Sequence, residues 1–155
     1  MKFHNFDIVF REIPDEVTLA VNITGCPFRC VGCHSPHLRE DIGEVLDESA
    51  VDRLLDRYAA AITCFCFMGG DACRNEVEQM ARHIRARARI KIGWYSGGNA
   101  MPLHPDLFDY VKTGAYIPDK GGLDTPGTNQ RMFRRNGHGW EDITARFLKK
   151  KFDRG

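Results

Sequence analysis

The chain has 155 residues, with 22 basic and 21 acidic side chains and a formal net charge of +1. This length suits a single domain over residues 1–155 and is too short for a complete eight-fold β/α barrel, which takes about 250 residues. The balanced charge gives no reason to expect nucleic-acid binding, and no apolar run reaches the roughly 18 residues that cross a membrane. Six cysteines, without a signal-peptide-like apolar segment in 1–11, predict a cytoplasmic protein whose thiols serve metal or redox chemistry.

The first half of the chain alternates between strand-like and helix-like patterns. An apolar run rich in β-branched residues predicts a buried strand over 17–23. Apolar residues at helical spacing predict a helix over 47–62, and an acid three residues after Ser49 favours a start near that serine. A second buried strand is predicted over 63–68, and Asn75 is predicted to cap a second helix.

The second half continues the alternation as far as a fourth strand. We expect a third strand over 90–95, a short helical piece over 105–108 and a strand over 110–112. The glycine-rich stretch 114–127 predicts a loop, and aromatic and aliphatic residues within 140–148 suggest a last helix. This order predicts a parallel sheet with helical crossovers outside it, and a ligand site at the carboxyl ends of the strands.

A group of closely spaced cysteines follows the first predicted strand. Cys26, Cys30 and Cys33 place three thiols within eight residues of a turn-prone loop, so they can converge on one metal centre. Iron–sulfur clusters that only transfer electrons usually have four cysteine ligands. Three ligands leave one iron free to bind something else, and the spacing favours a 4Fe–4S cluster of this kind.

Other interpretations of the cysteines stay open at this point. Zinc could take the three thiols together with His34 or His37, or with one of the remaining cysteines, Cys64, Cys66 and Cys73. The thiols could also be buried without a metal, and we expect Cys64 and Cys66 to pack because they lie in an apolar run. An electron-transfer ferredoxin is disfavoured because no fourth cysteine stands at the usual spacing.

Two short segments end the next two predicted strands. Gly69 and Gly70 allow close approach of the backbone to a ligand, and the carboxylate of Asp71 suits a cationic amine. The alternative is an ordinary strand-to-helix turn, in which an acid is stabilising anyway. Ser96 and Gly97 end the third strand and could line the same pocket, or form a simple turn. The segments Asp109–Tyr116, Gly121–Asp124 and Thr128–Arg131 predict only a long functional loop.

Taken together, these segments resemble the radical S-adenosylmethionine superfamily over roughly residues 5–135. Cys-x3-Cys-x2-Cys is the superfamily pattern, and its extension to Gly-Cys-x3-Cys-x-Gly-Cys-His-x-Pro is similar to the activating enzymes of glycyl-radical proteins. Gly32 before the third thiol, and the segment 109–131, resemble the anaerobic ribonucleoside-triphosphate reductase activating proteins. The chain departs from that pattern at Ala115, where a proline is common, and at Ala72–Cys73, where Pro-Leu is expected.

The resemblance implies a fold, an activity and a set of site residues. The fold would be a partial, incomplete β/α barrel with a parallel sheet and helices outside. The activity would be that of an anaerobic oxidoreductase that cleaves S-adenosyl-L-methionine at one 4Fe–4S cluster per chain and generates a glycyl radical on the large subunit of the reductase. Flavodoxin or ferredoxin would donate the electron, and no catalytic side chain is expected beyond the cluster ligands Cys26, Cys30 and Cys33. Contacts with the cosubstrate are expected from Gly32, Cys33, His34, Gly69, Gly70, Asp71 and Ser96.

Two further functions remain as alternatives to this one. A radical enzyme acting on a small molecule would keep the cysteine loop but would not need the segment Thr128–Arg131. A zinc-binding structural module would need neither an open iron nor the two glycines at 69 and 70.

Overall fold

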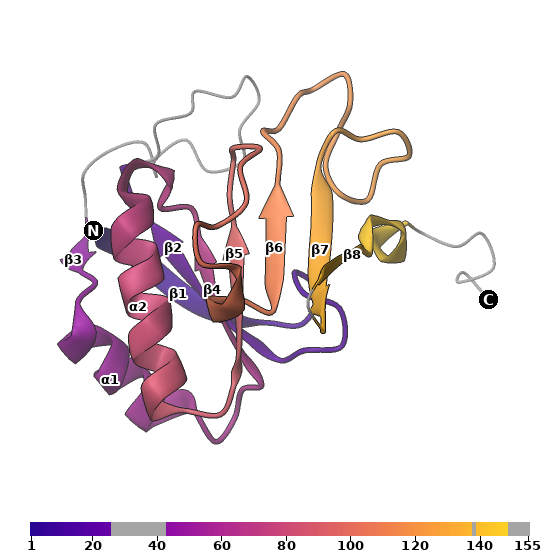
Figure 1. The fold of residues 1–155 in the computed structure, drawn as a ribbon. Coiled ribbons are helices and arrows are strands. Elements are labelled where there is room, and N and C mark those ends of the chain that lie inside the picture. Colours follow the sequence, from indigo (N-terminus) through magenta and orange to yellow (C-terminus); the bar gives the residue numbers. More distant parts are fainter. Residues whose placement is uncertain (26–42, 138, 149–155) are drawn as a thin grey trace.

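A single mixed sheet of eight strands dominates the computed structural model, which describes residues 1–25, 43–137 and 139–148 (Figure 1). In the sheet the strands lie in the order β3-β1-β2-β4-β5-β6-β7-β8. Their bounds are β1 Lys2–Val9, β2 Thr18–Ile23, β3 Glu44–Val45, β4 Cys64–Met68, β5 Lys91–Tyr95, β6 Tyr110–Thr113, β7 Arg131–Asn136 and β8 Gly139–Asp142.

The four central strands, β2, β4, β5 and β6, run parallel to one another. Asn22 lies opposite Met68, Met68 opposite Tyr95, and Tyr95 opposite Lys112, so these strands end level with each other. The outer strands β1 and β3 on one side, and β7 and β8 on the other, are antiparallel to their neighbours. The segments that follow β2, β4, β5 and β6 therefore all leave the sheet at the same edge.

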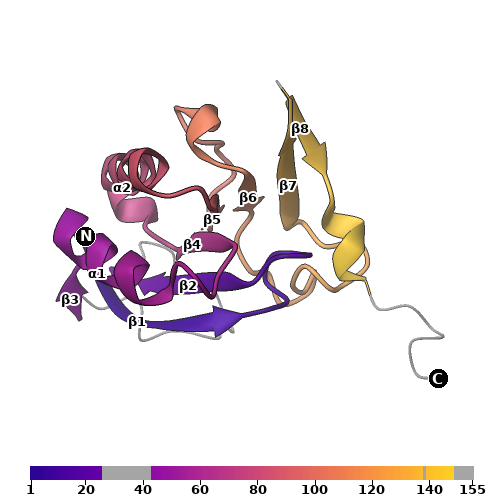
Figure 2. The same ribbon diagram turned by 90° about the horizontal axis from the view of Figure 1, so that it is seen from below.

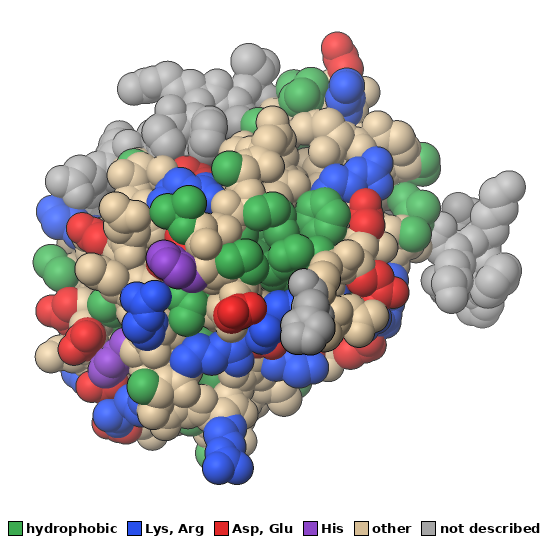
Figure 3. Space-filling view, viewed as in Figure 1, with side chains coloured by type: hydrophobic (Ala, Val, Ile, Leu, Met, Phe, Trp, Pro, Cys, Tyr) green, Lys and Arg blue, Asp and Glu red, His purple; other side chains and the backbone are tan. Residues whose placement is uncertain are grey.

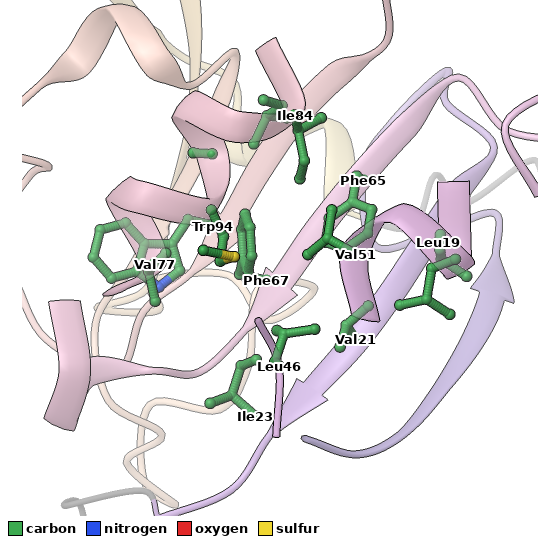
Figure 4. Close-up of a cluster of buried hydrophobic side chains, with 14 of the residues drawn as sticks. Leu19, Val21, Ile23, Leu46, Val51, Phe65, Phe67, Val77, Ile84 and Trp94 are labelled. Carbon is green, nitrogen blue, oxygen red and sulfur yellow. The ribbon is translucent and has the colours of Figure 1, made fainter. Parts of the chain in front are cut away.

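Two α-helices, α1 (Glu48–Tyr58) and α2 (Arg74–Arg87), cover one face of this sheet (Figure 2). The carboxylate of Asp47 caps α1 by accepting a hydrogen bond of 2.9 Å from the backbone nitrogen of Ala50. Alternate residues of the central strands point toward the helices and form the main core with them (Figure 4). The core side chains labelled there are Leu19, Val21, Ile23, Leu46, Val51, Phe65, Phe67, Val77, Ile84 and Trp94.

The opposite face of the sheet carries no α-helix in the described part of the chain. A smaller core lies there, built from Ile13, Cys64, Cys66, Tyr110, Met132 and Ile143. Ile13 belongs to the connection between β1 and β2, which crosses this face. Its side chain needs the space that Gly93 leaves, because a Cβ at Gly93 would lie 2.6 Å from its Cδ1 atom. We call this side the helix-free face.

The predicted partial β/α barrel with helices outside is wrong. Half of the strands are antiparallel additions, and only two short α-helices occur in the described residues, both on one face. The crossover from β5 to β6 contains Gly97, Gly98, Pro102 and Pro105, residues that oppose α-helix formation. Within it only the short 3-10 helix Pro105–Leu107 forms, where a short helical piece was predicted.

The ends of the chain also differ from the sequence-based expectation. A helix was predicted within 140–148, but β7 and β8 form a hairpin followed by a short 3-10 helix, Thr144–Phe147. The hairpin has a sequence signal, Asn136-Gly137, in which Gly137 has a φ of +61° and Asn136 pairs with Gly139. Strand β1 was not predicted, whereas the strands β2, β4, β5 and β6 and the helices α1 and α2 confirm the predicted order.

No helix in the described ranges is both long enough and apolar enough to span a membrane.

Packing of β4 against the helices predicts a large loss of stability when its core is truncated. Phe65 is fully buried, so Phe65→Ala should lower the free energy of unfolding by about 3–5 kcal/mol. Phe10 is 67 % exposed, and the same substitution there should change it by less than about 0.5 kcal/mol. Urea denaturation of the two variants measures both values, and equal losses would contradict the described core.

Candidate functional site

The candidate site lies at the edge where the parallel strands end. Three segments meet there: Thr24–Gly25 after β2, Gly69–Asp71 after β4, and Ser96–Gly98 after β5. The pairing of β2 with β4 and of β4 with β5 makes the three segments neighbours. The predicted site residues Gly69, Gly70, Asp71 and Ser96 are therefore brought together.

The predicted cluster ligands Cys26, Cys30 and Cys33 lie outside the described residues, as do Gly32, His34 and His37. The residues on either side of this segment are described. Thr24, just after β2, donates its backbone N–H to the carbonyl of Lys2 at 2.9 Å.

Gly43, where the description resumes, packs against the backbone of Phe3, and a Cβ there would lie 2.0 Å from the carbonyl oxygen of Phe3. Phe3 is paired with Ile23, the last residue of β2. Both flanks of the cysteine segment therefore lie at the carboxyl end of β2: Thr24–Gly25 follows Ile23 beside the turn after β4, and Gly43 lies on the opposite side of β2, against β1.

The turn after β4 depends on two glycines in left-handed backbone conformations. Gly69 has a φ of +101° and Gly70 a φ of +88°, which glycine adopts without strain. A Cβ at Gly70 would also lie only 2.6 Å from Cγ2 of Val77 in α2. These glycines let the chain turn closely over the first residues of α2.

The carboxylate of Asp71 points into the protein, and both of its oxygens accept hydrogen bonds there. Its side chain is only 4 % exposed. It accepts hydrogen bonds from the hydroxyl of Ser96, from the backbone nitrogen of Gly97 at 3.0 Å and from the guanidinium of Arg74 at 3.1 Å. Asp71 thus ties the turn after β4 to the turn after β5.

Arg74 completes this connection, and sequence reasoning missed it. Its guanidinium lies over the ring of Trp94, 4.3 Å from the ring centroid, and donates to the carbonyl of Ala100 at 3.1 Å. The indole nitrogen of Trp94 in turn donates to the carbonyl of Gly69 at 2.7 Å. We call Asp71, Arg74, Trp94 and Ser96 the turn clamp.

Lys112, on β6, extends the polar network along the same edge. Its side chain is buried, and its Nζ donates to the carbonyls of Ser96 at 3.2 Å and Gly114 at 2.8 Å. Burying a lysine requires such partners, because an uncompensated charge in the interior is costly. The cation therefore holds the end of β5 against the end of β6.

The predicted loop 114–127 is confirmed, and it is folded closely on itself. The hydroxyl of Thr128 donates to the carbonyl of Gly121 at 3.1 Å, and the amide of Asn129 donates to the carbonyl of Ala115 at 3.0 Å. The side-chain oxygen of Asn129 is buried without a hydrogen-bond partner. These contacts give the loop a defined shape beside β6.

A cavity of about 490 Å³ lies on the helix-free face, next to the end of β5. Tyr95 is the last residue of β5, and its hydroxyl donates to the carbonyl of Glu12. Burial raises the pKa of Tyr95 well above its ordinary value, so the phenol stays protonated and donates. The wall of the cavity includes Phe10, Arg11, Glu12, Tyr95, Leu123 and Phe147.

Three of the six thiols are described, and none resembles a metal ligand. Cys64 and Cys66 are fully buried on the helix-free face, which confirms the predicted packing role. Burial raises the pKa of both thiols well above the ordinary value, and this disfavours the thiolate that binds metals. Cys73 is half-buried, and burial raises the pKa of its thiol as well. In the described ranges, no three His, Cys, Asp or Glu side chains are grouped to hold a metal ion.

The surface that carries α2 shows basic and acidic side chains intermixed (Figure 3). Several arginines of this region form ion pairs, including Arg85 with Asp109 at 2.6 Å and Arg87 with Asp56 at 2.5 Å. The near-zero net charge is thus also balanced locally, by pairs of opposite charge.

Comparison with known proteins gives one family. The sequence profile described as a 4Fe-4S single cluster domain matches residues 16–110, more than half of the chain. The match includes the cysteine segment, the turn after β4 and the turn after β5. No significant match was found among curated proteins or among solved structures.

The glycine turn predicts a difference between two alanine substitutions. Gly70→Ala combines an unfavourable φ with a clash against Val77, whereas Gly127→Ala has a similar φ of +78° and open space around the added Cβ. We expect Gly70→Ala to lower the free energy of unfolding by about 1–3 kcal/mol more than Gly127→Ala. Chemical denaturation measures the difference, and equal losses would show that Val77 does not constrain the turn.

The raised thiol pKa values predict the order of alkylation in the native protein. At pH 8 a protonated thiol reacts slowly, so Cys64 and Cys66 should stay unmodified by iodoacetamide until the protein unfolds. Cys73 should react slowly, and its rate should rise about tenfold per pH unit below its pKa as the thiolate fraction grows. Peptide mass spectrometry follows each site, with urea-unfolded protein as the control. Native labelling of Cys64 at the unfolded rate would contradict its burial.

Proposed function

Because the chain belongs to the family of 4Fe-4S single cluster domains, we propose that it is a radical S-adenosylmethionine enzyme. Its substrate is a glycine of an anaerobic ribonucleoside-triphosphate reductase, on which it generates a glycyl radical. Cys26, Cys30 and Cys33 hold the cluster. The observation that carries the proposal is the position of the segment just before the cysteines, because the end of β2 adjoins the Gly69–Asp71 turn, which in turn lies beside the end of β5.

The thiols of the chain fit a cluster with three protein ligands. Cys64 and Cys66 are buried on the helix-free face with raised pKa values, so neither is suited to supply a fourth thiolate. The remaining closely spaced thiols are Cys26, Cys30 and Cys33. Three ligands leave one iron for a cosubstrate, whereas electron-transfer clusters usually have four.

When held by Cys26, Cys30 and Cys33, a reduced 4Fe–4S cluster would supply one electron for the reductive cleavage of S-adenosylmethionine to methionine and a 5′-deoxyadenosyl radical, and that radical would take a hydrogen atom from the substrate glycine. The residues of the chain bind and orient the reactants and exclude water. Gly69 and Gly70 allow the cosubstrate to approach the backbone, and Ser96 lies beside them. By resemblance, Gly32 and His34 contact the cosubstrate too. The electron comes from a flavodoxin or a ferredoxin.

A protein substrate would reach the candidate site from the helix-free face. The cavity beside Tyr95 has a volume of about 490 Å³ and opens between the β1–β2 connection and the loop that contains Leu123. Phe10 at its wall is 67 % exposed. A loop of another protein carrying a glycine could enter here without crossing the helices on the other face.

Anaerobic reconstitution with iron and sulfide tests the proposal. The wild-type protein should take up four irons, change its EPR spectrum when S-adenosylmethionine is added, and form 5′-deoxyadenosine with dithionite. Cys30→Ser should lose the cluster, because it removes one of three ligands. Cys73→Ser is the matched control and should keep it, since this thiol lies outside the cysteine segment.

The final step uses the reductase itself. Mixed with the reduced enzyme and S-adenosylmethionine, it should acquire the EPR signal of a glycyl radical. A colourless protein that binds one zinc and forms no 5′-deoxyadenosine would overturn the proposal and favour the zinc module. Formation of 5′-deoxyadenosine without a radical on the reductase would favour a small-molecule substrate.

A further inference from the structure

Arg74 occupies a position that is electrostatically unfavourable for its own helix. It is the first residue of α2, where the helix dipole presents its positive end and acidic residues are favoured. Its side chain is nevertheless only 28 % exposed, and its guanidinium is held by Asp71, Ala100 and Trp94. A cation kept in this place points to a role in the adjoining turns rather than in the stability of α2.

The contacts of Arg74 fix both turns of the candidate site at once. Through Asp71 it is connected to Ser96, and through Trp94 to the carbonyl of Gly69. Its second terminal nitrogen reaches the carbonyl of Ala100, beyond the turn after β5. Movement of the guanidinium would therefore release the turn after β4 and the turn after β5 together.

Both carboxylate oxygens of Asp71 already accept hydrogen bonds from the protein. One oxygen accepts from Ser96 and Arg74, and the other accepts from the backbone of Gly97. Its negative charge is already compensated by the guanidinium. Because the charge of Asp71 is already paired with Arg74, a cationic amine at this turn would instead meet the carbonyl of Gly69 or Gly70, each of which accepts one bond from the protein and keeps a second lone pair.

We propose that Arg74 is a positioning residue for S-adenosylmethionine, and that Asp71 acts with it as part of the turn clamp rather than as a direct ligand of the cosubstrate. This rests on the proposed function, because it assumes that the Gly69–Asp71 turn receives the cosubstrate. Arg74 touches no reactant. It sets the distance between the backbone of the turn and Ser96, and so determines how tightly the cosubstrate binds.

Lysine cannot replace arginine in this role. The guanidinium is planar, stacks on the ring of Trp94 and donates in several fixed directions at once, whereas an ammonium on a flexible stem acts as a point charge. Arg74→Lys keeps the charge next to Asp71 but loses the stacking and the contact with Ala100. Arg74→Gln loses the charge as well.

The test measures steady-state kinetics of 5′-deoxyadenosine formation in reconstituted protein. Arg74→Lys and Arg74→Gln should keep the iron content of the wild type. Their KM for S-adenosylmethionine should rise about tenfold while kcat changes less than about twofold, the pattern expected when binding shared by ground state and transition state is lost.

Arg85→Gln is the matched control, because it removes an arginine of the same helix that pairs with Asp109 away from the site. It should lower thermal stability without changing KM. An unchanged KM in both Arg74 variants, or an equal rise in Arg85→Gln, would overturn the inference. Wild-type protein that forms no 5′-deoxyadenosine would instead overturn the proposed function on which it rests.

A double-mutant cycle separates the two roles possible for Asp71. If Asp71 acts through the turn clamp, Asp71→Asn combined with Arg74→Gln should raise KM no more than the larger of the single effects. If Asp71 binds the cosubstrate directly, the two effects should multiply, and this outcome would contradict the inference. Should Arg74→Gln fail to fold, the same cycle is run with Arg74→Lys.

Discussion

Parallel pairing of β2, β4, β5 and β6 is the constraint on which the candidate site depends. Because these strands end level with one another, chain segments that are up to about 90 residues apart in sequence leave the sheet at the same edge. Turning any one strand around would move its segment to the far edge. The two helices on one face and the small core on the other hold this arrangement in place.

The turn clamp adds precision to what the sheet provides. Strand pairing brings the ends of β4 and β5 close, but each end is a glycine-containing turn with considerable freedom. Asp71 and Arg74 restrict that freedom, because the side chain of Asp71 is only 4 % exposed and accepts hydrogen bonds from Arg74 and from the backbone of Gly97. A binding surface made of backbone atoms needs such support, since a backbone turn has no side chains of its own to fix its shape.

The sequence predicted the four parallel strands but not the outer strands β1, β7 and β8, and the reasons can be identified. Runs such as Cys64–Met68 are apolar throughout, which is typical of strands buried on both faces. Strand β1 has several exposed residues and no comparable run, and the hairpin of β7 and β8 was hidden by apolar residues that also fit a helix. The predicted barrel was wrong because its fold rested on the resemblance. The glycines and prolines between β5 and β6 oppose a third α-helix in that connection.

The site was predictable to the extent that it consists of short motifs. Gly69, Gly70 and Ser96 were identified because their types and their place after strands both point to a ligand. Arg74 and Lys112 were not, because several of their partners lie 16 to 27 residues away in the chain, and the sequence around a lysine or arginine does not show that its side chain is buried. The position of the cysteine segment itself lies outside the described residues.

The outermost strands of the sheet have a consequence for how a second protein can attach. β3 has only two residues and begins with Glu44, and β8 has four residues and ends with Glu141 and Asp142. Short edges with charged side chains are poor templates for a strand of another chain. A protein that bound this chain would therefore contact side chains on the faces of the sheet and would not pair with the backbone at its borders.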